Sequence, residues 1–201
     1  MIIWLASYPK SGNTWMRMFL KSYFLKPNEK FNLDNKKEDS FKAQAFPDQT
    51  LLDQLKIDFN KFEEIVKNWE TMQDYINLNG RTNFVKTHNA MCKVGSYKFT
   101  STRNTKGAIY IVRDPRDVLV SMSHHMGYGY ERTFEHLTSS YNFEYPSSGD
   151  KRYKRSLVGS WSDHYKSWKN YKKSKVLIIK YEDMVSNELD TFSKVIKYLK
   201  E

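Results

Sequence analysis

Four short runs rich in apolar residues divide the sequence, and the longer segments between them carry apolar residues every three or four positions. The runs cover residues 2–5, 82–87, 108–112 and 176–179. The first of them is apolar at every position, which is typical of a strand covered on both faces of a parallel sheet. Because such strands alternate with amphipathic segments, the sequence predicts an α/β fold with a P-loop-like doubly wound parallel sheet flanked by helices.

Local signals place several of the helices. Asn60 and Glu63 form a capping-box-like pair before a long amphipathic stretch, and Gly80 follows its end. Asp114 and Pro115 are the cap and first residue of another helix. The remaining helices are expected near residues 15–23, 51–55, 157–171 and 189–199.

Three polar segments interrupt this pattern. Residues 28–44 are predicted to form a loop, and residues 89–106 are expected to shape part of an acceptor pocket. Residues 127–155 mix glycine, tyrosine and basic residues without a clear period, and we interpret them as a mobile lid or acceptor segment. At 201 residues, the chain is expected to fold as a single domain over residues 1–201.

The formal net charge of +10 favours anionic partners, although it does not choose among nucleotides, acidic acceptors and polyanions. The single cysteine, Cys92, cannot form an internal disulfide bond. No apolar stretch is as long as a membrane span, and no charged leader precedes the first strand. We therefore expect a cytoplasmic protein that does not associate with membranes.

The clearest candidate for a ligand-binding segment is residues 7–15, Ser-Tyr-Pro-Lys-Ser-Gly-Asn-Thr-Trp, between the first predicted strand and the first predicted helix. Backbone N–H groups at a helix N-terminus lack intrahelical partners, so such a turn suits an anion. Lys10 adds a cation, Ser11 and Thr14 add hydroxyl groups, and Gly12 allows close approach of a ligand. The lysine precedes the only glycine of the turn, which is not the spacing of a nucleoside triphosphate loop. The turn predicts a phosphate site and disfavours an ordinary kinase.

Three segments, in this order along the chain, resemble the PAPS-dependent sulfotransferases. Residues 8–15 resemble the Y-P-K-S-G-T-T-W loop that binds the 5′-phosphosulfate in that family, with Asn13 in place of the first threonine. Residues 85–88, Val-Lys-Thr-His, are similar to its K-T-H segment. Residues 111–121 resemble its 3′-phosphate segment, in which an arginine and a serine lie eight residues apart. With weaker matches near Trp161 and Tyr181, the resemblance runs from about residue 2 to about residue 199.

The resemblance implies transfer of a sulfonate group from 3′-phosphoadenosine 5′-phosphosulfate (PAPS) to a hydroxyl or amine, which leaves adenosine 3′,5′-bisphosphate (PAP). It implies that His88 is the general base, that Lys10 stabilises the leaving phosphate and that Lys86 holds the sulfonate oxygens. The cofactor-binding residues that it implies are Lys10, Ser11, Gly12, Asn13, Thr14, Trp15, Arg113, Ser121 and Tyr181. No metal ion is expected to take part, because positioning and positive charge supply most of the rate of such a transfer.

One feature of the family is missing from the sequence. Family members have an R-K-G loop beyond the last helix that also binds the 3′-phosphate, and the 201 residues contain no such loop. We expect either that residues 151–155 supply this contact or that the 3′-phosphate site is more open. The acceptor, a small molecule or a glycan, and the oligomeric state cannot be inferred.

Three other functions remain open at the level of the sequence. A catalytically weak 3′,5′-bisphosphate nucleotide-binding protein would explain the missing loop, but His88 and Lys86 together argue against it. A P-loop nucleotide kinase is opposed by the position of Lys10. The only feature that suggests a nucleic-acid-binding protein is the positive net charge, and the sequence contains no recognisable RNA-binding motif.

Overall fold

The structure is a computed structural model that describes residues 1–25, 43–144 and 156–201. Most of the loop predicted over residues 28–44 lies outside the described residues. The basic part of the predicted lid, including residues 151–155, also lies outside them.

Five parallel strands form the central sheet of the described chain, in the order β2-β3-β1-β6-β9. The strands are β1 Ile2–Ser7, β2 Gln44–Ala45, β3 Asn83–Thr87, β6 Thr105–Val112 and β9 Lys175–Lys180. In the middle, Ala6 of β1 is opposite Thr87 of β3, and Ser7 is opposite Ile111 of β6. The four predicted apolar runs are the four longer strands, so the prediction of a parallel sheet is confirmed.

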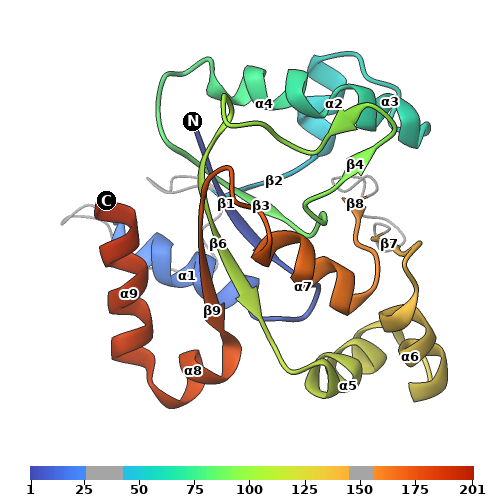
Figure 1. Cartoon of the computed structure of the whole chain (residues 1–201), viewed down its shortest axis with the longest axis vertical. Helices are drawn as coiled ribbons and strands as arrows, with labels where there is room; N and C mark the ends of the chain where they lie inside the picture. The colour runs from blue at the N-terminus through green and yellow to red at the C-terminus, as the bar shows by residue number, and fades with distance from the viewer. Residues whose placement is uncertain (26–42, 145–155) are drawn as a thin grey trace.

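Helices cover both faces of this sheet (Figure 1). The helices are α1 Asn13–Tyr23, α2 Gln49–Gln54, α3 Phe62–Lys67, α4 Trp69–Asn77, α5 Pro115–Met126, α6 Tyr130–Thr138, α7 Trp161–Lys169, α8 Tyr181–Ser186 and α9 Glu188–Lys200. Side chains alternate along β1: Trp4 packs with α2, α3, α4 and α7, whereas Leu5 packs with α1, α8 and α9. This two-sided burial explains why β1 is apolar throughout, and it confirms the predicted α/β class.

The helices α5 and α6 lie beyond the C-terminal ends of the strands (Figure 1). They form a third apolar cluster with the start of the turn after β1, and this cluster includes Tyr8, Val118, Met122 and Leu137. The caps predicted for α5 are confirmed, because the Asp114 side chain accepts a hydrogen bond from the backbone N–H of Arg116 and Pro115 is the first helical residue. Helix α5 therefore starts shortly after Val112, the last residue of β6, with Asp114 as its N-cap.

The helix predicted from Asn60 to Gly80 is wrong in two respects. The N-cap is Lys61 rather than Asn60, whose backbone N–H instead donates to Asp58 Oδ1 at 3.0 Å. The stretch is also divided into α3 and α4 at Asn68, whose side-chain amide donates to the carbonyl oxygen of Glu64 at 2.8 Å. A side chain that bonds to the preceding turn competes with the regular backbone ladder, so the period alone did not reveal the break.

Short elements replace two of the predicted polar segments. Within residues 89–106, β4 Lys93–Val94 and β5 Tyr97–Lys98 form an antiparallel pair. Within residues 127–155, α6 is a regular helix, and β7 Phe143–Glu144 pairs with β8 Ser156–Leu157. The helix predicted over 157–171 begins only at Trp161, because Ser160 caps it by accepting from the backbone N–H of Asp163 at 3.1 Å.

Candidate functional site

The C-terminal ends of four neighbouring parallel strands carry the residues singled out by the sequence. β1 leads into the turn with Lys10, β3 ends beside His88, β6 is followed by Arg113 and β9 by Tyr181. In a parallel sheet these ends share one edge, which is where α/β proteins place their ligands. The sheet order therefore brings together residues that lie up to 171 positions apart in the sequence (181 − 10).

The turn after β1 is shaped by two left-handed residues. Lys10 has a φ of 68°, and Gly12, the N-cap of α1, has a φ of 98°. A Cβ atom on Gly12 would lie 2.5 Å from Cδ2 of Tyr181, so both the backbone and the neighbouring ring require glycine there. Ser11 is buried, and its hydroxyl oxygen has no hydrogen-bond partner in the described structure. A buried hydroxyl group beside the N-terminus of a helix fits an anionic oxygen as its partner.

We predict that Gly12→Ala weakens PAP binding at least tenfold, since the added methyl group must displace Tyr181 or reshape the turn. The matched control is Gly95→Ala, because Gly95 also has a positive φ of 58° but has open space around the position of the Cβ atom. Both variants should lose stability through the left-handed backbone, by about 1 kcal/mol, whereas only Gly12→Ala should lose PAP. Calorimetric titration with PAP on both variants gives the comparison, and equal affinities would contradict the steric argument.

Asn13, which differs from the family loop, bonds through its side-chain amide to the preceding strand. Its amide group donates to the carbonyl oxygen of Leu5 at 2.9 Å and to Ser7 Oγ at 3.2 Å. The side-chain amide thus ties the turn to β1, and the backbone N–H of Asn13 lies at the first turn of α1, where it can meet an anion. The ring of Trp15 packs against Tyr181 and Phe192.

His88 is a buried histidine in a defined protonation state. Its Nδ1 lies 2.7 Å from the carbonyl oxygen of Ser7, which can only accept, so Nδ1 carries the proton and the ring lone pair is at Nε2. Burial is the main reason why the pKa of His88 lies well below its ordinary value of 6.5, and the charge of Lys86 lowers it further. The hydrogen bond to Ser7 raises this pKa, and His164 and Arg17 make smaller lowering contributions. The imidazole is therefore neutral at neutral pH and able to accept a proton.

The lowered pKa of His88 sets the sign of the pH dependence. If neutral His88 is the base, the transfer rate should stay level as the pH falls from about 8 to about 6, and it should decrease only in more acid solution. The same lowered pKa implies that folding stability is full above 6.5 and declines as the pH falls below that value, since the unfolded chain then binds the proton more readily. A single-turnover rate that halves near pH ~6.5 would contradict this prediction.

Arg113 joins the turn to the strand ends. Its Nη1 donates to the carbonyl oxygen of Lys10 at 3.2 Å, and its guanidinium carbon lies 4.3 Å from the centre of the Tyr181 ring. Nε of Arg113 is 3.9 Å from a carboxylate oxygen of Asp117. Because these contacts leave donors of the planar guanidinium group, Arg113 can still bind a phosphate.

A cavity of about 420 Å³ lies between these groups. Its lining includes most of the predicted site residues: Lys10, Gly12, Asn13, Thr14, Lys86, His88, Arg113, Ser121 and Tyr181. Ser11 and Trp15 are not among its lining residues. A larger hollow of about 680 Å³ lies between α1 and α9, against Phe19 and Leu189, and it contains none of the predicted residues. We place the site at the strand ends, because the charged and titratable groups converge there.

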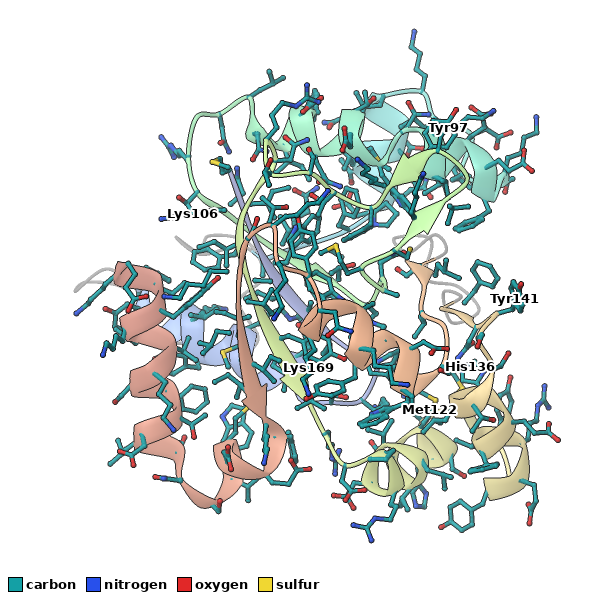
Figure 2. The ribbon with its side chains drawn as sticks, viewed as in Figure 1. Tyr97, Lys106, Met122, His136, Tyr141 and Lys169 are labelled. Atoms are coloured by element: carbon teal, nitrogen blue, oxygen red, sulfur yellow. The ribbon has the colours of Figure 1, made fainter. Side chains whose placement is uncertain are left out.

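The cavity also contacts residues that the sequence analysis did not assign. Arg17 lies one turn into α1 and reaches Thr14 Oγ1 with Nη2 at 3.4 Å. On the other side, the lining includes Met122 of α5 and His136 of α6, which Figure 2 shows in the corner of the molecule next to α7. The spacing of Arg17 from Thr14, three positions on one helix, is a signal that the sequence did contain. The contribution of α6 was missed because the segment was interpreted as part of a lid, although Tyr130, Phe134 and Leu137 have helical spacing.

Other reactive groups of the described chain lie outside this arrangement. Burial raises the pKa of Cys92 to about 11, so its thiol is protonated at neutral pH. Among the described residues, no group of three or more histidine, cysteine, aspartate or glutamate side chains could hold a metal ion. None of the helices in residues 1–25, 43–144 and 156–201 is long and apolar enough to cross a membrane.

The comparisons with known proteins agree with one another. The family model of the sulfotransferase domain matches residues 2–201. The luciferin sulfotransferase of Photinus pyralis is 29% identical over 206 residues, which cover 97% of this chain and 50% of that protein. The crystal structure of mouse sulfotransferase SULT7A1 complexed with PAP has a TM-score of 0.57 at 20% identity, covering 99% of this chain and 58% of that one, which shows a shared fold. The chain thus spans about half the length of the luciferin sulfotransferase and somewhat more than half the length of the mouse protein chain.

Proposed function

Because the chain belongs to the sulfotransferase domain family, we propose that it transfers a sulfonate group from PAPS to an acceptor hydroxyl or amine. The observation that carries this proposal is the neutral His88 beside Lys86, in a cavity that also contacts Lys10 and Arg113. A neutral base suits deprotonation of an acceptor, and the surrounding cations suit an anionic donor. We also propose that residues 1–201 act as a single domain.

The residues of the site fit PAPS by their chemistry. Lys10, the hydroxyl groups of Ser11 and Thr14 and the backbone N–H groups at the start of α1 would hold the 5′-phosphate, and the unpartnered buried Ser11 hydroxyl supports this assignment. Arg113 and Ser121 would hold the 3′-phosphate, and the Tyr181 ring, already stacked against Arg113, would lie beside the adenine. PAPS supplies the activated sulfonate group when bound.

The chain's own groups then account for the proton and the charge. His88 Nε2 accepts the proton of the acceptor, while its Nδ1–H group remains on the Ser7 carbonyl oxygen. Lys86 holds the sulfonate oxygens, and Lys10 stabilises the charge that develops on the leaving phosphate. Burial of His88 and Lys86 keeps water from these groups and strengthens their electrostatic effect.

The direct test is transfer of labelled sulfonate from [³⁵S]PAPS to pooled acceptors that include phenols, aliphatic alcohols, amines and glycans. The relative in Photinus pyralis is named for luciferin, so luciferin should be tried first. Labelled product that depends on His88 would support the proposal. PAP binding without transfer to any pool would instead favour a bisphosphate-binding protein.

We predict that Arg113→Ala lowers affinity for PAP by about tenfold or more, while affinity for adenosine 5′-phosphate changes little, because bidentate arginine contacts to phosphate are strong. Arg116→Ala is the matched control, since Arg116 lies three positions away with a side chain that is 88% exposed and bound to Asp114. Calorimetry with both nucleotides gives the ratio of affinities. A wild-type protein that binds the two nucleotides equally would remove the 3′-phosphate site from the proposal.

A further inference from the structure

Helix α7 holds the backbone of the segment that follows β3. Three side chains on one face of the helix contact it: His164 Nε2 lies 3.1 Å from the carbonyl oxygen of His88, and Trp168 Nε1 donates to the carbonyl oxygen of Asn89 at 3.0 Å. Ser167 Oγ accepts from the backbone N–H of Met91 at 3.0 Å. Positions 164, 167 and 168 share a face because a helix returns to the same side after three or four residues.

The proton positions around His164 follow from its partners. The carbonyl oxygen of His88 can only accept, so the proton of the His164 ring is on Nε2. Nδ1 is then an acceptor, and the hydroxyl group of Tyr110 on β6 donates to it at 2.8 Å. Burial lowers the pKa of His164 to about 4, so the ring is neutral and supplies a directed hydrogen bond rather than a charge.

We propose that His164 is a positioning residue: its Nε2–H group fixes the backbone of His88, so that the Nε2 atom of His88 faces the cavity at the correct place for proton transfer. His88 is then held at two points, at its carbonyl oxygen by His164 and at its ring by the carbonyl oxygen of Ser7. The chain Tyr110, His164, His88, Ser7 thereby links β6, α7, β3 and β1. This inference rests on the proposed function, in which His88 is the base.

The packing around His164 leaves its ring little freedom. His164 and Tyr110 are fully or almost fully buried, and the Tyr8 ring meets the imidazole edge to face with centroids 5.4 Å apart. A shift of the imidazole would leave two buried polar groups, the Tyr110 hydroxyl and the His88 carbonyl, without their partners. A small displacement of a general base is sufficient to slow proton transfer.

The test compares His164→Leu with His164→Gln. Leucine fills a similar volume without a donor, whereas the amide nitrogen of glutamine can still donate to the carbonyl oxygen of His88. In ¹⁵N NMR spectra of the ring nitrogens, His164→Leu should change the tautomer balance of His88 and move its pKa toward the ordinary value. The titratable groups facing His88 in the wild type are Lys86, Arg17 and His164, so Lys86 and Arg17 are kept in every variant.

The kinetic test measures two quantities for each variant, the turnover number and the affinity for PAP. With the acceptor that reacts fastest in the pooled screen, His164→Leu should lower the turnover number about tenfold, with PAP affinity unchanged, and His164→Gln should restore most of it. His124→Ala, an exposed histidine on α5, is the control and should match the wild type. If His164→Leu does not fold, Tyr110→Phe replaces it, since it removes the hydroxyl group that donates to Nδ1 of His164 and so loosens the ring that holds the His88 carbonyl oxygen.

Two outcomes would overturn the inference: an unchanged His88 signal and pKa in the folded leucine or phenylalanine variant, or a glutamine variant no better than leucine. A wild-type protein without PAP binding or transfer would instead contradict the proposed function, and the NMR comparison would still report on the placement of His88. The two failures are therefore distinguishable.

Discussion

Replacement of His88 with alanine is expected to lower the turnover number by about a hundredfold or more, while the fold and PAP binding persist. The reason is the separation of roles in the structure. The ring of His88 reaches the cavity from the end of β3, whereas the proposed phosphate-binding groups come from the turn after β1 and from the end of β6. Loss of the ring removes the proton acceptor and leaves those groups in place.

Three measurements on His88→Ala decide between a catalytic and a structural histidine: the melting temperature, the PAP affinity and the turnover number. His124→Ala serves as the control for loss of a histidine from the chain. A structural histidine would cause the melting temperature and PAP affinity to fall together, because its hydrogen bond to Ser7 supports the turn after β1. Turnover near the wild-type value would exclude His88 as the base.

The sequence predicted the parts of the fold that depend on local pattern. The apolar runs became the strands of a two-sided parallel sheet because Trp4 and Leu5 must be buried on opposite faces. Asp114 and Pro115 start α5 as predicted, since a cap and a first-turn proline act within a few residues. These features need no information about distant parts of the chain.

Where the prediction failed, a competing contact decided the structure. Asp58 accepts from the backbone N–H of Asn60, which is the donor that Glu63 would need in a capping box, and α3 begins after Lys61 instead. Helix α6 was missed for another reason: Tyr130, Phe134 and Leu137 do have helical spacing, but the surrounding glycine, tyrosine and basic residues led to its interpretation as part of a lid.

The site itself was predicted through motifs, and only the structure shows how its members contact one another. Asn13 was expected to bind the nucleotide, and the structure adds that its side-chain amide also ties the turn to β1. His164 received no functional role from the sequence, because its partners Tyr110 and His88 are 54 and 76 positions away. Contacts at such separations follow from the order of the strands, which no local pattern specifies.

Lys10 is the second residue whose substitution is expected to have a large effect on the turnover number, because its positively charged side chain lines the cavity. Lys10 lies in the turn at a φ of 68°, and its carbonyl oxygen binds Arg113. Its backbone thus supports the proposed 3′-phosphate site, whereas its side chain lines the cavity. A substitution that changes only the ammonium group separates these two contributions.

Lys10→Met is expected to lower the turnover number by about a hundredfold or more, with PAP affinity reduced less than about tenfold. The ammonium group is proposed to act on charge that develops during transfer, and an interaction made in the transition state affects turnover more than ground-state binding. Lys98→Met, which removes one positive charge from β5, controls for the net charge of the protein. Single-turnover kinetics with PAPS, together with PAP calorimetry, give both quantities. If Lys10→Met raised the Michaelis constant and left the turnover number unchanged, Lys10 would bind donor and transition state equally, and the stabilisation of the leaving group would have to come from Lys86 and the amide groups of α1.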